Sequence, residues 1–228
     1  MRFIILATHR TGSTLLESYL NCHTNTPCSS ELFQAKVSHP LSVPRYIEWQ
    51  RFYRKSISRY ISKFVPAGGG FKLMYGQLSK FPDLQRYLIK HKILIIHIQR
   101  ENLLRRYLSY HLAKKTDSWS SNTSEYKLSP IKLNPENILN EIREMQKKVN
   151  HHRHFQKTNP YLDITYEDLS EFPDRTLSRI WNTLNEKPVQ LKTELVKQNP
   201  YPLVKMISNY QEIETALKGT SYEWMMID

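Results

Sequence analysis

The stretch FIILATHRTGSTLLESYL, residues 3–20, joins a short apolar run to a second apolar segment through a polar loop. Phe3 to Ala7 is typical of a buried strand, and Ser13 to Leu20 is predicted as a helix. Gly12 allows the backbone to come close to a ligand, and the free N–H groups at the start of the helix favour an anion. The sequence therefore opens with a strand–loop–helix unit suited to binding an anionic group such as a phosphate.

The loop differs from that of a P-loop NTPase. The NTPase motif is G-x-x-x-x-G-K-S/T, in which the Lys contacts the outer phosphates and the hydroxyl binds Mg²⁺. The corresponding residues here are Arg10, Thr11, Gly12, Ser13 and Thr14. No Lys precedes the Ser, and the basic residue Arg10 lies ahead of the glycine. A loop that only caps a buried helix is the alternative interpretation.

Further strands and helices alternate along the chain. Strands are predicted at three short apolar segments, Phe71 to Tyr75, Ile93 to Ile98 and Tyr161 to Thr165. Helices are predicted from Pro44 to Phe64 and from Pro135 onward, where the apolar residues Ile138, Ile142, Met145 and Val149 repeat at helical spacing. This alternation predicts a three-layer α/β/α fold around a central, mainly parallel sheet.

Length and composition are consistent with a single domain. The chain has 228 residues, of which 39% are hydrophobic, enough for one sizeable core. We therefore expect one domain over residues 1–228. Residues 114–135, KKTDSWSSNTSEYKLSPIKLNP, are polar, rich in serine and without a period. They are predicted to form a loop, or a lid over a site.

Charge and cysteine content indicate the partners and the compartment. The formal net charge of +12 favours negatively charged partners, among them nucleic acid, anionic lipid and polyanionic small molecules. No apolar run has the length of a transmembrane span, and no secretory signal pattern is present. Cys22 and Cys28 are the two cysteines, so we expect a reducing, cytoplasmic setting.

A second predicted strand end carries another basic residue. In ILIIHIQRENLLRRYLSYHLA, residues 93–113, Arg100 follows the apolar strand and Ser109 lies on the helix after it. Ligands of open parallel sheets bind at the carboxyl ends of the strands, so Arg10 and Arg100 are expected to face the same crevice. Two anion-binding strand ends indicate one ligand with two phosphate groups.

These segments resemble the sulfotransferase family that depends on 3'-phosphoadenylyl sulfate (PAPS). HRTGSTLL, residues 9–16, matches the motif that holds the 5'-phosphosulfate in that family, and QRENLLRRYLS, residues 99–109, looks like its 3'-phosphate segment. The resemblance assigns the 5'-phosphosulfate to Arg10, Thr11, Gly12, Ser13 and Thr14, and the 3'-phosphate to Arg100 and Ser109.

The resemblance extends in matching order from residue 3 to about residue 224. ITYEDL, residues 164–169, is similar to the segment whose aromatic ring contacts adenine, which nominates Tyr166. The C-terminal segment from residue 196 to 224 resembles the closing segment of bacterial members, with Lys197 as a weaker candidate for the phosphates. The chain is most similar to bacterial carbohydrate-type members, and the resemblance implies PAPS as donor, PAP as product and no metal.

The resemblance also indicates the catalytic groups. CSSELF, residues 28–33, places Glu31 where carbohydrate sulfotransferases have their general base. The second predicted strand, in FKLMYGQL, carries Lys72, which by analogy contacts the sulfuryl or bridging oxygen. A Lys at a strand end that extends to water is an equally good interpretation of Lys72. A surface Glu in a loop or at a helix start is the alternative for Glu31.

The predicted activity is transfer of the sulfuryl group of PAPS to a hydroxyl of an acceptor, with a carbohydrate or glycolipid favoured. Two other classes stay open. A nucleotide kinase or NTPase is disfavoured by the missing Gly-Lys pair and by the lack of an evident Mg²⁺ ligand. A non-catalytic module that binds nucleotides or nucleic acid would need no general base, whereas Glu31 is present. We expect no nucleic-acid partner.

Overall fold

The computed structural model of the chain describes residues 2–34, 56–116, 129–195 and 201–227. These residues form two compact units. The first contains Met1–Gln99 and Arg153–Thr193, and the second contains Arg100–His152 and Glu194–Asp228. The expectation of one domain stays a prediction. Part of the predicted helix 44–64, most of the predicted loop 114–135, and Lys197 lie outside the described residues.

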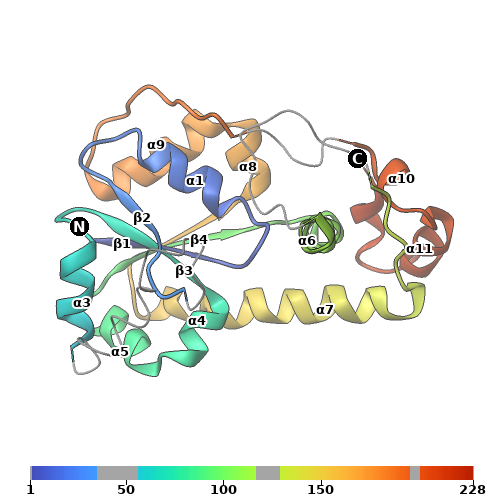
Figure 1. Cartoon of the computed structure of the whole chain (residues 1–228), viewed down its shortest axis with the longest axis horizontal. Helices are drawn as coiled ribbons and strands as arrows, with labels where there is room; N and C mark the ends of the chain where they lie inside the picture. Colours follow the sequence, from blue (N-terminus) through green and yellow to red (C-terminus); the bar gives the residue numbers. More distant parts are fainter. Residues whose placement is uncertain (1, 35–55, 117–128, 196–200, 228) are drawn as a thin grey trace. The chain divides into compact units, whose positions relative to one another are not determined.

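A five-stranded sheet forms the centre of the first unit (Figure 1). All neighbouring strands are parallel, and their order is β2-β3-β1-β4-β5. The strands are β1 (Phe3–Ala7), β2 (Cys28–Glu31), β3 (Gly70–Met74), β4 (Leu94–Gln99) and β5 (Tyr161–Thr165). Every residue of β1 is buried, as expected for a central strand that helices cover on both faces.

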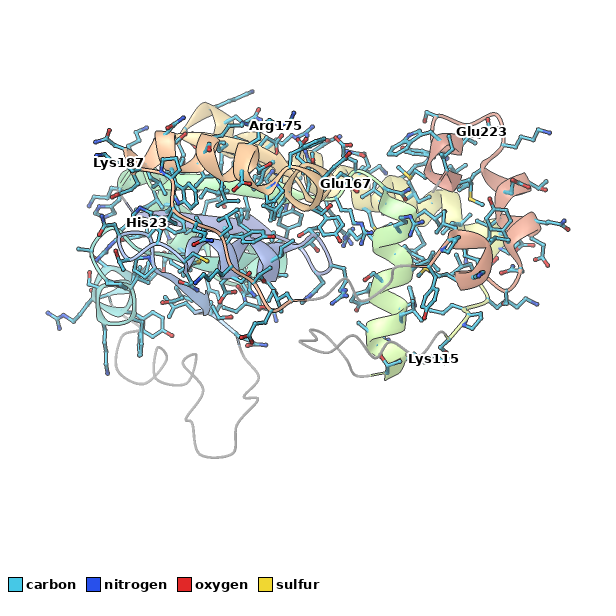
Figure 2. All side chains as sticks on the ribbon, turned by 90° about the horizontal axis from the view of Figure 1, so that it is seen from above. His23, Lys115, Glu167, Arg175, Lys187 and Glu223 are labelled. Carbon is cyan, nitrogen blue, oxygen red and sulfur yellow. The ribbon has the colours of Figure 1, made fainter. Side chains whose placement is uncertain are left out.

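Helices cover both faces of this sheet (Figure 1). One face carries α1 (Ser13–Leu20), α8 (Tyr166–Glu171) and α9 (Pro173–Leu184), and the other carries α3 (Ile57–Phe64), α4 (Tyr75–Lys80) and α5 (Pro82–Lys90). Leu16 of α1 and Trp181 of α9 share a core with Ile5 and Ile96 of the sheet. The outer surface of these helices is polar, and charged side chains such as Arg175 of α9 are exposed there (Figure 2). The predicted three-layer α/β/α fold is confirmed.

The second unit is helical. Its elements are α6 (Leu103–Thr116), α7 (Pro135–His152), α10 (Leu203–Met206), α11 (Tyr210–Leu217) and the 3₁₀ helix η3 (Glu223–Met226). Asn102 links two of them: its Oδ1 accepts a hydrogen bond from the Arg105 N–H of α6, and its Nδ2 donates to the carbonyl of Met225. The predicted helix from Pro135 is confirmed, with its four periodic apolar residues buried.

The predicted strands agree closely with those observed. β1 and β5 have the predicted bounds, and β3 and β4 are each displaced by one residue. β2 was not predicted, because Cys28–Glu31 contains two serines and a glutamate and has no apolar run. The short 3₁₀ helix η2 (Arg153–Lys157) precedes β5. None of the helices within the described ranges has the length and hydropathy needed to cross a membrane.

Gly70 allows β3 to begin beside β1. It pairs with Phe3, and a methyl group on its Cα would lie 2.6 Å from the Phe3 carbonyl oxygen and would overlap the Phe3 ring. Gly76, on the first turn of α4, is exposed and would place a methyl group in open space. The two glycines therefore make a matched pair for substitution.

We expect Gly70→Ala to lower the free energy of unfolding by about 1–3 kcal/mol, because the added methyl overpacks the core. Gly76→Ala should leave stability unchanged or raise it by up to about 1 kcal/mol, because Ala favours the helix. Urea denaturation followed by circular dichroism measures both. Equal stabilities of the two variants would contradict the close approach at Gly70.

Candidate functional site

The loop between β1 and α1 contains two residues in the left-handed region. Arg10 has φ of 66° and Gly12 has φ of 82°. Glycine adopts this conformation freely, whereas for Arg it costs on the order of 1 kcal/mol or more. Such local strain is typical of ligand-binding turns. The loop thus has a fixed, non-extended shape where the sequence predicts anion binding.

Backbone groups at the start of α1 are available to a ligand. Gly12 is the N-cap residue and has no side chain with which to cap the helix, and no side-chain cap bond forms here among the described residues. The Thr11 hydroxyl is engaged elsewhere, since it donates to the Thr8 carbonyl at 2.9 Å and closes the loop. No side chain of the loop therefore caps α1 among the described residues, and the assignment of the loop to an anion stays a prediction.

Tyr166 lies against this loop. It is the first residue of α8 and follows β5 directly, where Thr165 caps the helix by accepting a hydrogen bond from the Asp168 N–H at 3.0 Å. A methyl group on Gly12 would lie 2.5 Å from Cδ2 of the Tyr166 ring. The structure therefore brings the predicted adenine-contacting residue to the predicted phosphosulfate loop, and only glycine fits between them.

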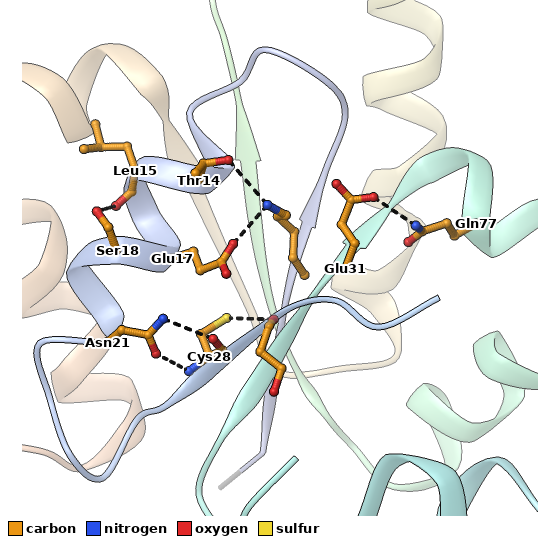
Figure 3. A network of polar contacts seen from close by, with 10 residues as sticks. Thr14, Leu15, Glu17, Ser18, Asn21, Cys28, Glu31 and Gln77 are labelled. Atoms are coloured by element: carbon orange, nitrogen blue, oxygen red, sulfur yellow. Dashed lines mark hydrogen bonds and ion pairs between the residues drawn. The ribbon is translucent and has the colours of Figure 1, made fainter. Parts of the chain in front are cut away.

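Lys72 is buried inside the sheet. It is the third residue of β3, lies opposite Ile5 of β1 and is 6% exposed. Its Nζ donates to Oε2 of Glu17 at 2.9 Å and to Oγ1 of Thr14 at 3.4 Å, the two contacts drawn to α1 in Figure 3. The interpretation of Lys72 as a strand-end side chain that extends to water is therefore wrong.

Glu17 was missed by the sequence analysis. It lies three residues after Thr14, so both side chains project from the same side of α1. The signal that was available is that Glu17 is the single charged residue of a helix that follows the predicted anion-binding loop. Its role depends on Lys72, which is distant in sequence, and only the fold shows that the two residues form an ion pair.

Glu31 lies at the end of the edge strand β2, beside Lys72. The pairing of β2 with β3 joins Cys28 to Gly70 and Ser29 to Phe71, then shifts by one residue and joins Glu31 to Lys72. A bulge of this kind re-aims the side chains that follow it. If the pairing continued without this shift, Ser30 would lie opposite Lys72. Glu31 therefore belongs to a strand, and its interpretation as a loop or helix-start residue is wrong.

A second residue missed by the sequence analysis contacts Glu31. Gln77 of α4 donates a hydrogen bond from Nε2 to Oε2 of Glu31 at 3.1 Å (Figure 3). The Gln77 Oε1 accepts from the Met74 N–H at 2.9 Å. No sequence signal identifies this contact, because a Gln in the first turn of a helix is commonly a capping residue.

Cys28 is the first residue of β2 and its side chain is buried. Burial, followed by the charge of Glu17, raises the pKa of the Cys28 thiol far above its ordinary value. The thiol therefore stays protonated at neutral pH and is a poor nucleophile. Cys22 and Cys28 are both free thiols in the structure.

Three predicted nucleotide-binding residues lie outside the first unit or outside the described residues. Arg100 follows β4 directly and belongs to the second unit, as does Ser109, which is buried on α6. Lys197 is not among the described residues. Their contacts with a nucleotide stay predictions. The structure brings together Arg10, the Thr11 to Thr14 segment, Glu31, Lys72 and Tyr166 in the first unit.

Loss of the Lys72 ammonium should destabilise the protein through Glu17. We expect Lys72→Met to lower the free energy of unfolding by about 3 kcal/mol, because the partly buried Glu17 carboxylate loses its counterion. Adding Glu17→Gln should restore much of the loss, since the uncompensated charge is then removed. Urea denaturation of both single variants and the double variant gives the coupling energy. Strictly additive changes would show that the ion pair contributes nothing.

Comparison with known proteins gives the fold a name. No family model matches the sequence, and no curated protein matches it. Among solved structures, the crystal structure of a sulfotransferase from Alicyclobacillus acidocaldarius is similar, with a TM-score of 0.50 and 14% sequence identity. The match covers 87% of this chain and 86% of the other. At this identity the similarity concerns the fold, and the chain has the sulfotransferase fold.

Proposed function

We propose that this protein is a sulfotransferase that moves the sulfuryl group of PAPS to a hydroxyl of a carbohydrate or glycolipid acceptor. The observation that carries the proposal is the pairing of Glu31 with Lys72 across adjacent strands, while Lys72 contacts Thr14 in the first turn of α1, directly after the loop at residues 8–12. A carboxylate, a buried ammonium group and a strand–loop–helix anion site are thus grouped in one unit. The sulfotransferase fold supports the same assignment.

The loop residues fit a PAPS-type donor. Arg10 supplies positive charge, and the N–H groups of Thr11 to Thr14 offer donors at the positive end of the α1 dipole. The Tyr166 ring lies against Gly12, where it can stack on an adenine base. When bound, the donor supplies an activated sulfuryl group. Arg100, Ser109 and Lys197 are proposed to hold the 3'-phosphate on the basis of the family resemblance.

Glu31, Arg10 and Lys72 have separate roles in the proposed reaction. Glu31 takes the proton of the acceptor hydroxyl, which makes the oxygen a better nucleophile. Arg10 and the backbone N–H groups of the loop stabilise the negative charge that develops on the leaving phosphate side. Lys72 is held by Glu17 and Thr14 at the start of α1, where its charge stabilises the transferring group. No metal ligand is required for these roles.

Nucleotide preference is the first test. We expect calorimetry to show that PAP binds more tightly than 5'-AMP, and more tightly than ATP with Mg²⁺, because two separate phosphate groups are recognised. Arg100→Ala should remove most of the preference for PAP over 5'-AMP. Preference for ATP with Mg²⁺ would favour a kinase, and the absence of any nucleotide binding would leave the basic binding module as the better proposal.

Glu31→Gln separates binding from chemistry. We expect this variant to bind PAP with unchanged affinity and to lose about 10²- to 10⁴-fold in turnover, the usual contribution of a positioned general base. The measurement is transfer of label from ³⁵S-PAPS to a panel of simple glycosides. Turnover close to that of the wild type would remove Glu31 from the mechanism.

A further inference from the structure

The side chain of Gln77 is fixed in one orientation. Gln77 lies in the first turn of α4, whose neighbouring residues Tyr75 and Leu78 are buried. The Met74 N–H can only donate, so it must face the amide oxygen of Gln77, to which it bonds at 2.9 Å. The amide NH₂ group therefore has to point the other way. It meets Oε2 of Glu31 at 3.1 Å (Figure 3).

This contact leaves one oxygen of Glu31 for chemistry. Oε2 accepts from Gln77, and within the described part of the chain no hydrogen bond reaches Oε1. A carboxylate with one oxygen tied loses most of its rotational freedom. The backbone on its C-terminal side is also fixed, because the Tyr60 hydroxyl donates to the Leu32 carbonyl at 2.9 Å and the Phe33 ring packs 5.5 Å from that of Tyr60.

The nearby charges show why a neutral partner matters. Lys72, opposite Glu31 in the sheet, directs its ammonium to Glu17 at 2.9 Å. Lys72 is thus ion-paired with Glu17, and the hydrogen-bond partner of Glu31 is the uncharged amide of Gln77. An ammonium bound directly to Glu31 would stabilise the ionised carboxylate and make it a weaker base. Gln77 orients the carboxylate through a hydrogen bond and adds no charge beside it.

We propose that Gln77 is a positioning residue for Glu31, holding one carboxylate oxygen so that the other faces the acceptor hydroxyl. The proposal rests on the assignment of Glu31 as general base. Gln77 does not touch the reacting atoms, and its effect is exerted through Glu31. It belongs to α4 and not to the anion loop, so it should leave nucleotide binding unchanged.

Two substitutions separate positioning from charge. Gln77→Met removes both hydrogen bonds at nearly constant size. Gln77→Glu keeps an acceptor for the Met74 N–H, and so keeps the start of α4, but it places a second carboxylate beside Glu31. Gly76→Ala is the control, since it changes the preceding residue of the same helix turn at an exposed position. Urea denaturation confirms that each variant is folded.

The kinetic test is transfer from ³⁵S-PAPS to methyl α-glucoside as a function of pH. We expect Gln77→Met to lower kcat by about tenfold to a hundredfold with KM changed little, as for a misplaced catalytic group. Gln77→Glu should move the acidic limb of the kcat profile upward by about one to two pH units, because neighbouring carboxylates resist joint ionisation. Gly76→Ala should match the wild type. A loss in Gln77→Met with an unmoved limb in Gln77→Glu would overturn the proposal.

A second readout needs no acceptor. In protein labelled with ¹³C at the glutamate carboxyls, the Glu31 signal is identified by its loss in Glu31→Gln. We expect the titration midpoint of the Glu31 signal to rise in Gln77→Glu and to remain unchanged in Gly76→Ala. An unchanged midpoint in Gln77→Glu would overturn the contact itself. If the midpoint rises but the wild type binds no PAP, the contact holds and it is the sulfotransferase assignment that fails.

Discussion

An ammonium group inside a parallel sheet requires a carboxylate close by, and the candidate site is arranged around that requirement. Lys72 lies in the middle of β3 and is buried, and Glu17 of α1 supplies the countercharge at 2.9 Å. The pair ties β3 to the helix that begins at the anion loop. Glu17 also binds the ammonium group that would otherwise be the nearest cation for Glu31 on the adjacent strand. The ion pair thereby leaves Glu31 with the uncharged Gln77 as its hydrogen-bond partner.

The anion loop adds a second constraint, which is conformational. Arg10 and Gly12 both have left-handed backbones, and the Tyr166 ring closes one side of Gly12. The Thr11 hydroxyl and the buried face of α1 hold the loop in that shape. A loop that is shaped before the ligand arrives loses less conformational entropy on binding, which is the general advantage of preorganised sites.

Elements with a local apolar pattern can be predicted from the sequence, whereas elements and contacts that depend on residues distant in sequence cannot. β1 and α7 could be predicted because β1 is a continuous apolar run and α7 carries apolar residues at helical spacing. β2 could not, because a bulged edge strand with two serines has no such pattern. Glu31 was found through family resemblance, whereas Glu17 and Gln77 gain their meaning from partners that are 55 and 46 residues away. The sequence also shows no sign of the division into two units, because the boundary before Arg100 falls in the short connection between β4 and α6, where no linker composition marks it.

The bulge in β2 has a consequence for the comparison of distant relatives. A relative with a regular edge strand would set the same carboxylate opposite the same lysine with one residue fewer. An alignment that runs through CSSELF without a gap would then match that carboxylate to Ser30. Residue counting alone would suggest that the carboxylate has been lost where it is present. At 14% identity, alignments in this region should follow strand pairing and not motif spacing.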